Sequence, residues 1–318
     1  MSGWALSVHT CGEPPALVDR EPPTPKSGEV LVTVAAASIT PLDLLCATGT
    51  SYFGAPATPY VPGVQGVGTA DGRTVWFPTS AGMRPGDGSM AAHVVVPAED
   101  LVSLPDVDPA LMAALGLSAV AAHLALSWRG ELAAGEQVIV LGAGGVVGQA
   151  AVQLAKVAGA RRVVAAARSA VAQDRAKAAG ADVVVTLDSS DVDELAARFE
   201  SAVDGPADLV LDPLFGVPAV SAARALRAGG RLVNLGGSAG ETAPFTSSLL
   251  RSKSLRLMGY TNNELTAEQR ASAIAAVATM AAEGRLTVPY ETVSPGDAPA
   301  AWARHAAGKG DLRTVVVA

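Results

Sequence analysis

The middle of the chain, residues 112–262, alternates between short apolar runs and longer stretches in which apolar residues recur every three to four positions. The recurrence of apolar residues every three to four positions predicts amphipathic helices. The expected strands are Gln137–Leu141, Arg162–Ala167, Asp182–Thr186, Leu209–Asp212, Arg231–Leu235 and Ser254–Gly259. The expected helices are Gly145–Ala158, Ala170–Ala179, Val192–Val203 and Pro218–Ala228. Strands this apolar, joined by helices, predict a parallel sheet covered on both faces, and six of them complete a doubly wound nucleotide-binding sheet.

The flanking segments have a different pattern. Residues 1–111 are rich in proline and glycine, and their β-branched runs predict an all-β, barrel-like unit. These runs are Val30–Val34, Thr74–Phe77 and His93–Val96. Residues 263–318 begin with an amphipathic helix, Thr266–Glu283, and end in the strand-like Arg313–Val317. Because this tail has the strand pattern of the first segment, we expect it to rejoin that domain.

Composition and charge narrow the class of protein. Of the 318 residues, 49% are apolar and 17% are charged, which excludes a disordered chain. The net charge of −7 argues against nucleic acid as a partner, because phosphate binding needs a basic face. The apolar stretch Leu111–Trp128 carries His123 and several small residues, so we interpret it as a buried helix and expect no membrane span. Met1–Trp4 show no secretory pattern, and the expected location is cytoplasmic.

The two cysteines, Cys11 and Cys46, cannot form a cysteine-rich zinc site or a disulfide framework. A single bridge between them is disfavoured in a reducing compartment. We interpret both as packed thiols.

The strongest chemical signal is a glycine cluster between an expected strand and an expected helix. Gly142, Gly145 and Gly148 have a G-x-x-G-x-x-G spacing, while the stricter G-x-G-x-x-G spacing fails at Val147. Glycines permit a tight turn and a close approach of the backbone to a pyrophosphate, which the helix N-terminus attracts. We therefore expect Gly142, Gly145, Val146 and Val147 to bind a dinucleotide. The alternative is a glycine-rich turn without a ligand.

The end of the second expected strand indicates which dinucleotide is bound. An NAD site usually has an acidic residue there to bind the ribose 2′-hydroxyl, whereas this strand ends in Arg168 and Ser169. A guanidinium pairs with a 2′-phosphate that a carboxylate would repel. We therefore expect NADPH, bound by Arg168 and Ser169, with Arg175 as a second candidate. The alternative for Arg168 is a solvated surface arginine.

Further cofactor contacts are expected where the fourth, fifth and sixth strands end, because ligands bind outside the carboxyl ends of a parallel sheet. The residues at these three ends are Asp212, Pro213, Gly236, Gly237, Ser238 and Tyr260. We expect them to border the nicotinamide, with Gly236, Gly237, Ser238 and Tyr260 as cofactor-binding residues.

Several segments carry a resemblance to a known family. They are Ala36–Asp43, Pro59–Gly68, Ala114–Ala119, the glycine turn, Leu211–Pro213 and Leu235–Gly237. In these segments the chain resembles the medium-chain dehydrogenase/reductase superfamily, specifically its zinc-free quinone oxidoreductase-like branch. The resemblance implies an α/β fold: a Rossmann doubly wound parallel sheet in residues 112–262, and a GroES-like β-barrel domain formed by residues 1–111 and 263–318. It also implies a homodimer joined at the sheet edge near Ser254–Gly259.

The resemblance also shows where this chain departs from zinc-dependent relatives. Their catalytic zinc ligands would fall at Thr40, Val64 and Ala114, and their proton-relay hydroxyl would fall at Leu42. None of these residues is suited to that role, and the lobe with four cysteines is absent. Alcohol oxidation needs a Lewis acid or a base to remove the hydroxyl proton. We therefore expect no metal and disfavour alcohol oxidation.

The resemblance implies reduction of quinones or polarised C=C bonds by NADPH, with hydrogen-bond donors near the carbonyl oxygen that gains negative charge. Tyr52 falls within one residue of a pocket tyrosine of related reductases and is the first candidate for proton donor. Its alternative is a packing role. Thr40 stands where close relatives have asparagine, and it either donates to a carbonyl or satisfies a local backbone group. Asp43 is better explained as holding a loop or a neighbouring amide.

The favoured function is a zinc-independent, NADPH-dependent oxidoreductase that transfers hydride to a quinone or to an enone, enal or enoyl substrate. A biosynthetic tailoring reductase of enoyl or ketone groups would have the same sequence features. An alternative of another class is a non-catalytic NADPH-binding redox sensor. The expected partners are a small-molecule substrate and a second copy of the chain.

Overall fold

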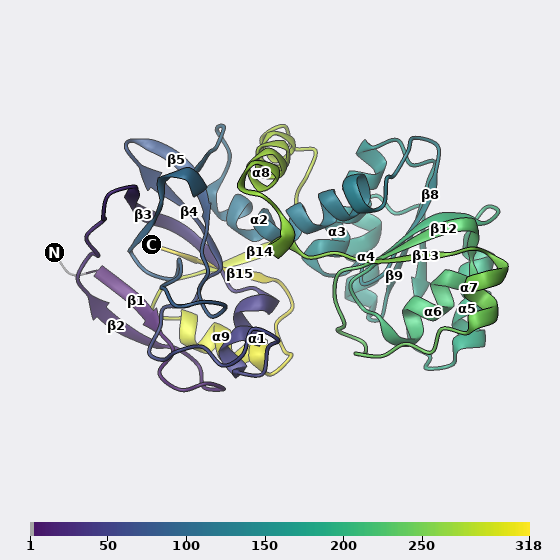
Figure 1. The fold of residues 1–318 in the computed structure, drawn as a ribbon, viewed down its shortest axis with the longest axis horizontal. Helices are drawn as coiled ribbons and strands as arrows, with labels where there is room; N and C mark the ends of the chain where they lie inside the picture. Colours follow the sequence, from purple (N-terminus) through teal and green to yellow (C-terminus); the bar gives the residue numbers. More distant parts are fainter. Residues whose placement is uncertain (1–2) are drawn as a thin grey trace. The chain divides into compact units, whose positions relative to one another are not determined.

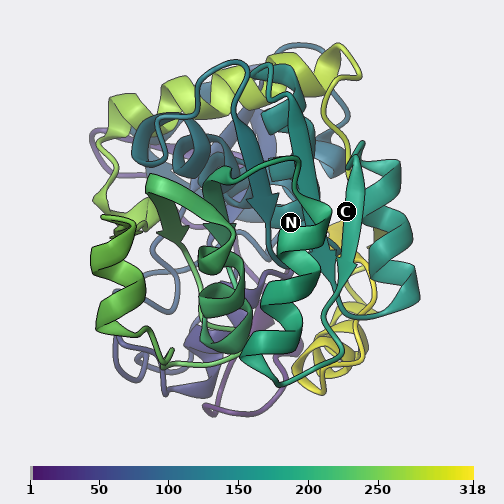
Figure 2. The ribbon, with the colours of Figure 1, turned by 90° about the vertical axis from the view of Figure 1, so that its right-hand side faces the viewer.

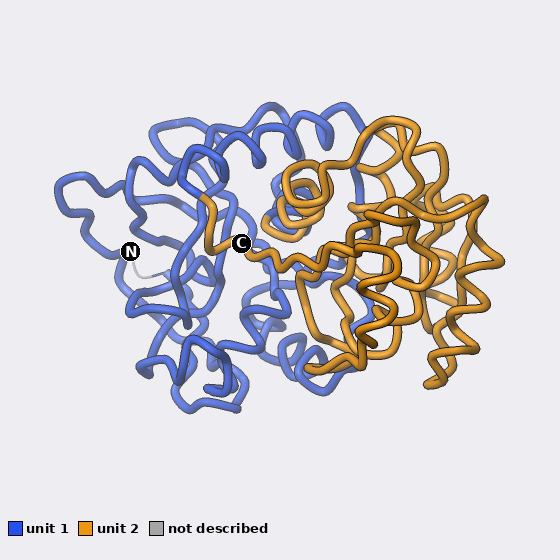
Figure 3. Tube along the Cα trace, turned by 45° about the vertical axis from the view of Figure 1, so that its right-hand side comes forward, with its two compact units in different colours: residues 1–116, 266–318 blue, residues 117–265 orange. Residues whose placement is uncertain are grey.

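The computed structural model describes residues 3–318, and the chain divides into two compact units. The first unit comprises Met1–Gly116 and Thr266–Ala318, and the second comprises Leu117–Leu265. Figure 3 shows the two units in different colours. The first boundary between the units lies after residue 116, five residues later than expected from the sequence. The second boundary lies after residue 265, three residues later than expected.

The second unit is built on a six-stranded parallel sheet. Its strands are β8 (Gln137–Val140), β9 (Arg162–Ala167), β10 (Val183–Thr186), β11 (Ala207–Asp212), β12 (Leu226–Asn234) and β13 (Arg256–Gly259). Their order across the sheet is β10-β9-β8-β11-β12-β13, so the direction of winding reverses between β8 and β11. Such a reversal is the point at which doubly wound proteins bind ligands. The predicted sheet is confirmed.

Helices cover both faces of this sheet (Figure 2). They are α3 (Val146–Val157), α4 (Ala170–Ala178), α5 (Val192–Ala202), α6 (Gly216–Arg224) and α7 (Ser247–Ser252). Ile139 and Val210 of the sheet belong to the same buried cluster as Leu195 and Phe199 of α5. The helix therefore buries its apolar stripe against the strands, as its spacing predicts.

One predicted helix end is wrong. The expected helix Pro218–Ala228 ends at Arg224 in the structure, because Leu226 already pairs with Ala207 of β11. Strand pairing decides this boundary, whereas the alanine-rich sequence is compatible with a longer helix.

The apolar stretch before β8 is helical but interrupted. Helix α2 runs from Pro109 to Leu124, and Gly116 breaks it with φ 30° and ψ −129°. A π-helical turn, η2 (Ala125–Arg129), follows. Pro109–Arg129 is long and apolar enough to cross a membrane, but 67% of its most apolar window is buried inside the protein. This burial is typical of a core helix.

The first unit contains a seven-stranded sheet and a separate hairpin of β1 (Gly3–Ser7) and β2 (Ala16–Arg20). The sheet strands are β3 (Glu29–Ser38), β4 (Gln65–Ala70), β5 (Arg73–Pro78), β6 (His93–Pro97), β7 (Val102–Ser103), β14 (Tyr290–Val293) and β15 (Arg313–Val317). The helices are α1 (Pro41–Thr48), α8 (Ala267–Ala282) and α9 (Ala298–Ala306), all labelled in Figure 1.

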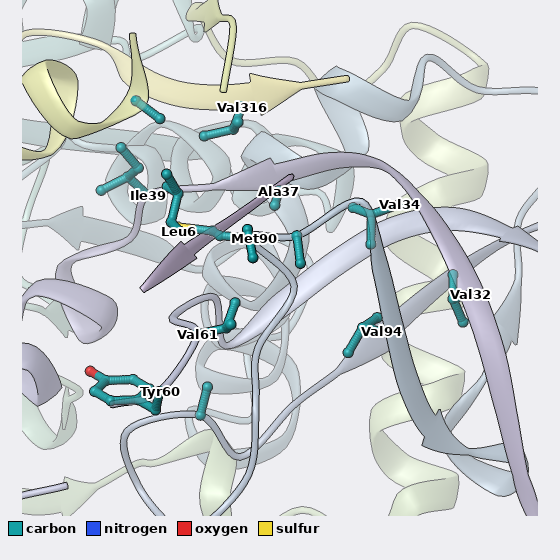
Figure 4. Packing of buried hydrophobic residues seen from close by; sticks show 14 of the residues in the cluster. Leu6, Val32, Val34, Ala37, Ile39, Tyr60, Val61, Met90, Val94 and Val316 are labelled. Carbon is teal, nitrogen blue, oxygen red and sulfur yellow. The ribbon is translucent and has the colours of Figure 1, made fainter. Parts of the chain in front are cut away.

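The core of the first unit gathers side chains from distant parts of the chain (Figure 4). Leu6, Val34, Met90 and Val316 belong to one buried cluster. Val316 reaches it because β15 pairs antiparallel with β3, next to Ala37. The end of the chain thus completes a core that the first hundred residues begin.

Candidate cofactor and active site

The glycine turn connects β8 to α3 with an open helix N-terminus. Gly142 has a positive φ of 63°, a conformation that favours glycine. Gly145 is the N-cap of α3, and no side chain caps the helix there. A Cβ on Gly145 would have nothing nearer than 3.7 Å. The first N–H groups of α3, beginning at Val146, therefore remain available to an anion.

Two other glycines let the turn pack closely. A Cβ on Gly148 would lie 2.5 Å from the Cα of Ala143, and a Cβ on Gly144 would lie 2.8 Å from the Cα of Ala172 in α4. The Gln149 side chain also holds the turn, because its Nε2 donates to the Gly144 carbonyl at 2.8 Å. The cradle therefore fits a dinucleotide phosphate, and Gly144 is a packing residue that the spacing argument did not single out.

Arg168 and Ser169 follow β9 directly. The Ser169 side chain caps α4 by accepting from Ala172 N at 3.2 Å. Arg168 is exposed, and among residues 3–318 no ion pair is formed by its guanidinium. An exposed, unpaired guanidinium at this strand end is free to bind a phosphate.

Asp212 organises the turns after β11 and β12. Its Oδ1 accepts from Leu214 N at 3.0 Å and from Phe215 N at 2.8 Å. Asn234 Nδ2 donates to Asp212 Oδ2 at 3.0 Å and to the Gly236 carbonyl at 2.8 Å. Burial raises the pKa of the Asp212 carboxyl, and these hydrogen bonds oppose the rise. Asn234 was missed by the sequence argument, because an amide inside a strand gives no motif.

The turns after β11 and β12 meet the glycine turn at the carboxyl ends of the strands. A Cβ on Gly142 would lie 3.1 Å from side-chain atoms of both Pro213 and Leu214. Ser238 Oγ donates to the Pro213 carbonyl at 3.2 Å. The structure therefore brings together the predicted residues that follow β8, β11 and β12, at the carboxyl ends of these strands.

Tyr260 follows β13, and its side chain is held in place by burial and by a hydrogen bond. It is buried, and its hydroxyl donates to Asn262 Oδ1 at 2.7 Å. Burial raises the pKa of this hydroxyl. The Trp128 ring contacts Tyr260 edge-on, with 6.5 Å between the ring centroids. Its cofactor role stays a prediction, while its present contacts are those of a packed tyrosine.

Thr40 lies in the first unit as the N-cap of α1 and forms a capping box with Asp43. Its Oγ1 donates to Asp43 Oδ2 at 2.6 Å and accepts from Asp43 N at 3.2 Å. The hydroxyl proton is therefore already used, which corresponds to the local role that we considered for Thr40. Asp43 Oδ1 in turn accepts from Gly63 N at 3.0 Å and Val64 N at 2.9 Å.

Tyr52 lies on the loop after α1 and is 77% exposed. Its ring packs on Phe53 with 4.2 Å between centroids. Tyr60 is 6% exposed, and its hydroxyl has no hydrogen-bond partner in the described part of the chain. Of these two phenols, only Tyr52 presents its hydroxyl to solvent in this unit.

The residues at the zinc-ligand positions do not fit a metal ion. Val64 and Ala114 carry no donor side chain, and the Thr40 hydroxyl is bound to Asp43. Across residues 3–318, no three His, Cys, Asp or Glu side chains are clustered so that they could hold a metal. We assign no chemical step to one.

A shallow groove of about 740 Å³ lies elsewhere, between the edge strand β10 and α5. Arg198, one of its lining residues, is already paired with Asp188 and Glu194, both at 2.5 Å. The groove contains none of the predicted site residues, and we assign it no role.

Known proteins resemble this chain in both sequence and fold. A family model described as zinc-binding dehydrogenase matches residues 146–279. Human mitochondrial enoyl-[acyl-carrier-protein] reductase is 31% identical over 251 residues, which are 74% of this chain and 65% of that protein. The quinone oxidoreductase of Thermus thermophilus, solved alone and with NADPH, is 29% identical, with a TM-score of 0.83 and complete (100%) coverage of both chains. A mycobacterial quinone oxidoreductase has the same fold at 23% identity, with a TM-score of 0.88 over 99% of this chain and 100% of that one.

The doubly wound sheet, the accompanying β unit and the glycine turn define the class: the chain belongs to the medium-chain dehydrogenase/reductase superfamily. Within it, the chain is a member of the quinone oxidoreductase-like branch, with its Rossmann and GroES-like parts. The chain spans between 37% and 65% of the length of three curated relatives that it matches.

Proposed function

We propose that this protein is an NADPH-dependent oxidoreductase that reduces a quinone, or a C=C bond conjugated to a carbonyl, without a metal ion. The observation that carries the proposal is the uncapped glycine cradle at Gly142–Gly148 beside a strand that ends in Arg168 instead of an acid. The names of the relatives, enoyl reductase and quinone oxidoreductase, support this class of reaction.

NADPH, when bound, supplies the hydride. The N–H groups of Val146 and Val147 at the start of α3 would hold the pyrophosphate, and Arg168 would pair with the 2′-phosphate beside Ser169. Gly236, Gly237 and Ser238 would border the nicotinamide, because they follow β12 next to the Pro213 turn.

Hydride addition places negative charge on a carbonyl oxygen, which needs a hydrogen-bond donor and then a proton. The Thr40 hydroxyl donates its proton to Asp43, so we assign it the role of fixing the start of α1. Tyr52, whose side chain is exposed, is the proposed proton donor, and a water molecule is the alternative donor.

The direct test is NADPH oxidation, followed by the loss of its absorbance, with a panel of simple quinones, enals, enones and enoyl thioesters. We expect turnover with one or more of these classes and little turnover with primary alcohols and NADP⁺. A tailoring reductase would turn over only the enones or the enoyl thioesters of the panel. Tight NADPH binding without turnover of any of them would favour the redox-sensor alternative.

Cofactor choice tests the role of Arg168. Arg168→Gln removes a charge-assisted contact to the 2′-phosphate, so we expect the Kd for NADPH to rise about 10- to 100-fold, with little change for NADH. Fluorescence titration measures both constants. Arg161→Gln is the matched control, because Arg161 lies before β9, at the opposite end of that strand, and pairs with Asp204. Equal affinity of the wild-type protein for NADH and NADPH would contradict the assignment.

A further inference from the structure

Asp212 is a buried carboxylate without a cationic partner. It is 0% exposed, and among residues 3–318 no Lys, Arg or His forms an ion pair with it. The other buried carboxylate in this part of the chain, Asp43, has the Arg313 guanidinium nearby. Burying an uncompensated charge is costly, so a carboxylate of this kind indicates a function.

Hydrogen bonds favour the ionised form of Asp212. Its Oδ1 accepts from Leu214 N at 3.0 Å and from Phe215 N at 2.8 Å. Its Oδ2 accepts from Asn234 Nδ2 at 3.0 Å. A proton on either oxygen would face one of these donors, so the hydrogen bonds oppose the rise in pKa that burial causes. Peptide and amide dipoles stabilise the carboxylate without cancelling its charge, and Asp212 therefore leaves a net negative charge inside the second unit.

The strand order determines which half of a bound dinucleotide would lie near this charge. The order across the sheet is β10-β9-β8-β11-β12-β13. Arg168, the proposed partner of the 2′-phosphate, follows β9 on one side of the glycine turn, and Asp212 ends β11 on the other side. A Cβ on Gly142 in that turn would lie 3.1 Å from the side chain of Pro213, the residue after Asp212. A cofactor with its adenosine half over β9 would therefore have its nicotinamide half over β11 and β12.

We propose that the charge of Asp212 makes bound NADPH a stronger hydride donor, because it favours the positively charged ring of NADP⁺ over the neutral ring of NADPH. Loss of a hydride changes the nicotinamide ring from neutral to singly positive, while the charge of the phosphates stays the same. A fixed buried carboxylate stabilises the positive ring without having to move. The inference rests on the proposed function and adds to it a residue that acts on the cofactor through its electrostatic field.

The ratio of two dissociation constants measures this effect. Asp212→Asn removes the charge but keeps an oxygen that can accept from the same two backbone N–H groups. Asn234 Nδ2 keeps the Gly236 carbonyl, now at 2.8 Å, as an acceptor. For a charge about 10 Å from the ring at an effective dielectric constant of about 20 to 40, we expect the Kd for NADP⁺ divided by the Kd for NADPH to rise about 4- to 16-fold. Calorimetric titration of the full-length protein with each cofactor measures both constants.

Asp208→Asn is the matched control. Asp208 lies near the other end of β11, about 13 Å along the strand from Asp212, and it pairs with Arg227 at 2.5 Å. Because this carboxylate is both distant and compensated, the ratio should stay within about twofold of wild type. Asp212→Glu keeps the charge but changes the length of the side chain. It should weaken both cofactors by a similar factor and keep the wild-type ratio.

Asp212→Ser is a second neutral variant, for use if the asparagine variant does not fold, because a serine hydroxyl can accept from the same N–H groups. Its ratio should rise as in Asp212→Asn. Equal weakening of NADP⁺ and NADPH in a neutral variant would mean a purely structural role, and it would overturn this inference while leaving the proposed function intact. Failure of the wild-type protein to bind NADPH would instead overturn the proposed function, and this inference with it.

Discussion

At the scale of single residues, hydrogen-bond partners decide what a side chain can contribute. Thr40 and Tyr260 both carry hydroxyls, but each donates its proton to a neighbour, Asp43 and Asn262 respectively. Tyr52 is exposed, with no such partner among the described residues. The residue type is visible in the sequence, whereas the availability of its proton depends on neighbours that only the fold supplies.

The half-buried His123 gives a pH prediction at this scale. Burial in α2 lowers the pKa of His123, so the unfolded chain binds a proton more readily than the folded one. Stability should therefore fall as the pH drops below about 6.5, by at most about 1.4 kcal/mol per pH unit. His123→Gln should reduce this dependence in urea unfolding at about pH 5 and about pH 7.5, and part of it should remain because burial also lowers the pKa of His305.

The matched control for this experiment is His9→Gln, because His9 is exposed. That variant should keep the wild-type loss of stability in acid. An unchanged pH dependence in His123→Gln would show that another group is responsible.

At the scale of elements, the N-termini of helices α1 and α3 differ in whether their backbone N–H groups can bind a ligand. The two helix starts differ in their caps: α1 has a complete capping box, while α3 has none. A capped start satisfies its own N–H groups, and an uncapped one leaves them for a ligand. This contrast explains why we assign a structural role to Thr40 and a binding role to the start of α3.

The capping role of Thr40 can be measured. Thr40→Ala removes two hydrogen bonds with Asp43, so we expect the free energy of unfolding to fall by about 1 to 2 kcal/mol. Thr40→Ser keeps the hydroxyl and should stay near wild type. Urea unfolding followed by the fluorescence of the buried Trp76 and Trp302 reports on the first unit. Wild-type stability in Thr40→Ala, with lower turnover, would instead indicate a direct part in the reaction.

At the scale of the whole molecule, sheet edges are the places where a second copy can add. Strand β13 is an edge of the parallel sheet, and Leu257 on it is 39% exposed. An open strand edge readily pairs with another strand. We propose that two copies join their β13 edges to form a homodimer.

Leu257→Lys tests this dimer. A charge at the paired edge should weaken association about tenfold or more, which light scattering during gel filtration detects as a shift toward monomer. Val171→Lys is the control, because Val171 is 52% exposed on α4 and away from the edge. A monomeric wild-type protein, or a dimer that is unaffected by Leu257→Lys, would contradict the proposal.

Apolar pattern and glycine spacing predicted the larger part of the second unit, because both are local properties. Strand β9 and the final strand β15 have the predicted bounds. The hairpin of β1 and β2 was not predicted, because β2 is largely exposed and its alternation is weak. A Cβ on Gly116 would collide with the side-chain amide of Gln65, and this contact was also invisible, since it joins residues that are far apart in the chain.

By itself, the sequence determined the doubly wound sheet, the glycine cradle, the arginine that follows β9 and the lack of zinc-binding side chains at the expected positions. These features follow from residue types and short spacings. Tertiary structure alone decided which hydroxyl keeps its proton, where α6 ends and why α2 breaks. Each of these depends on a hydrogen bond or a strand pair between distant residues, and such contacts exist only after the chain has folded.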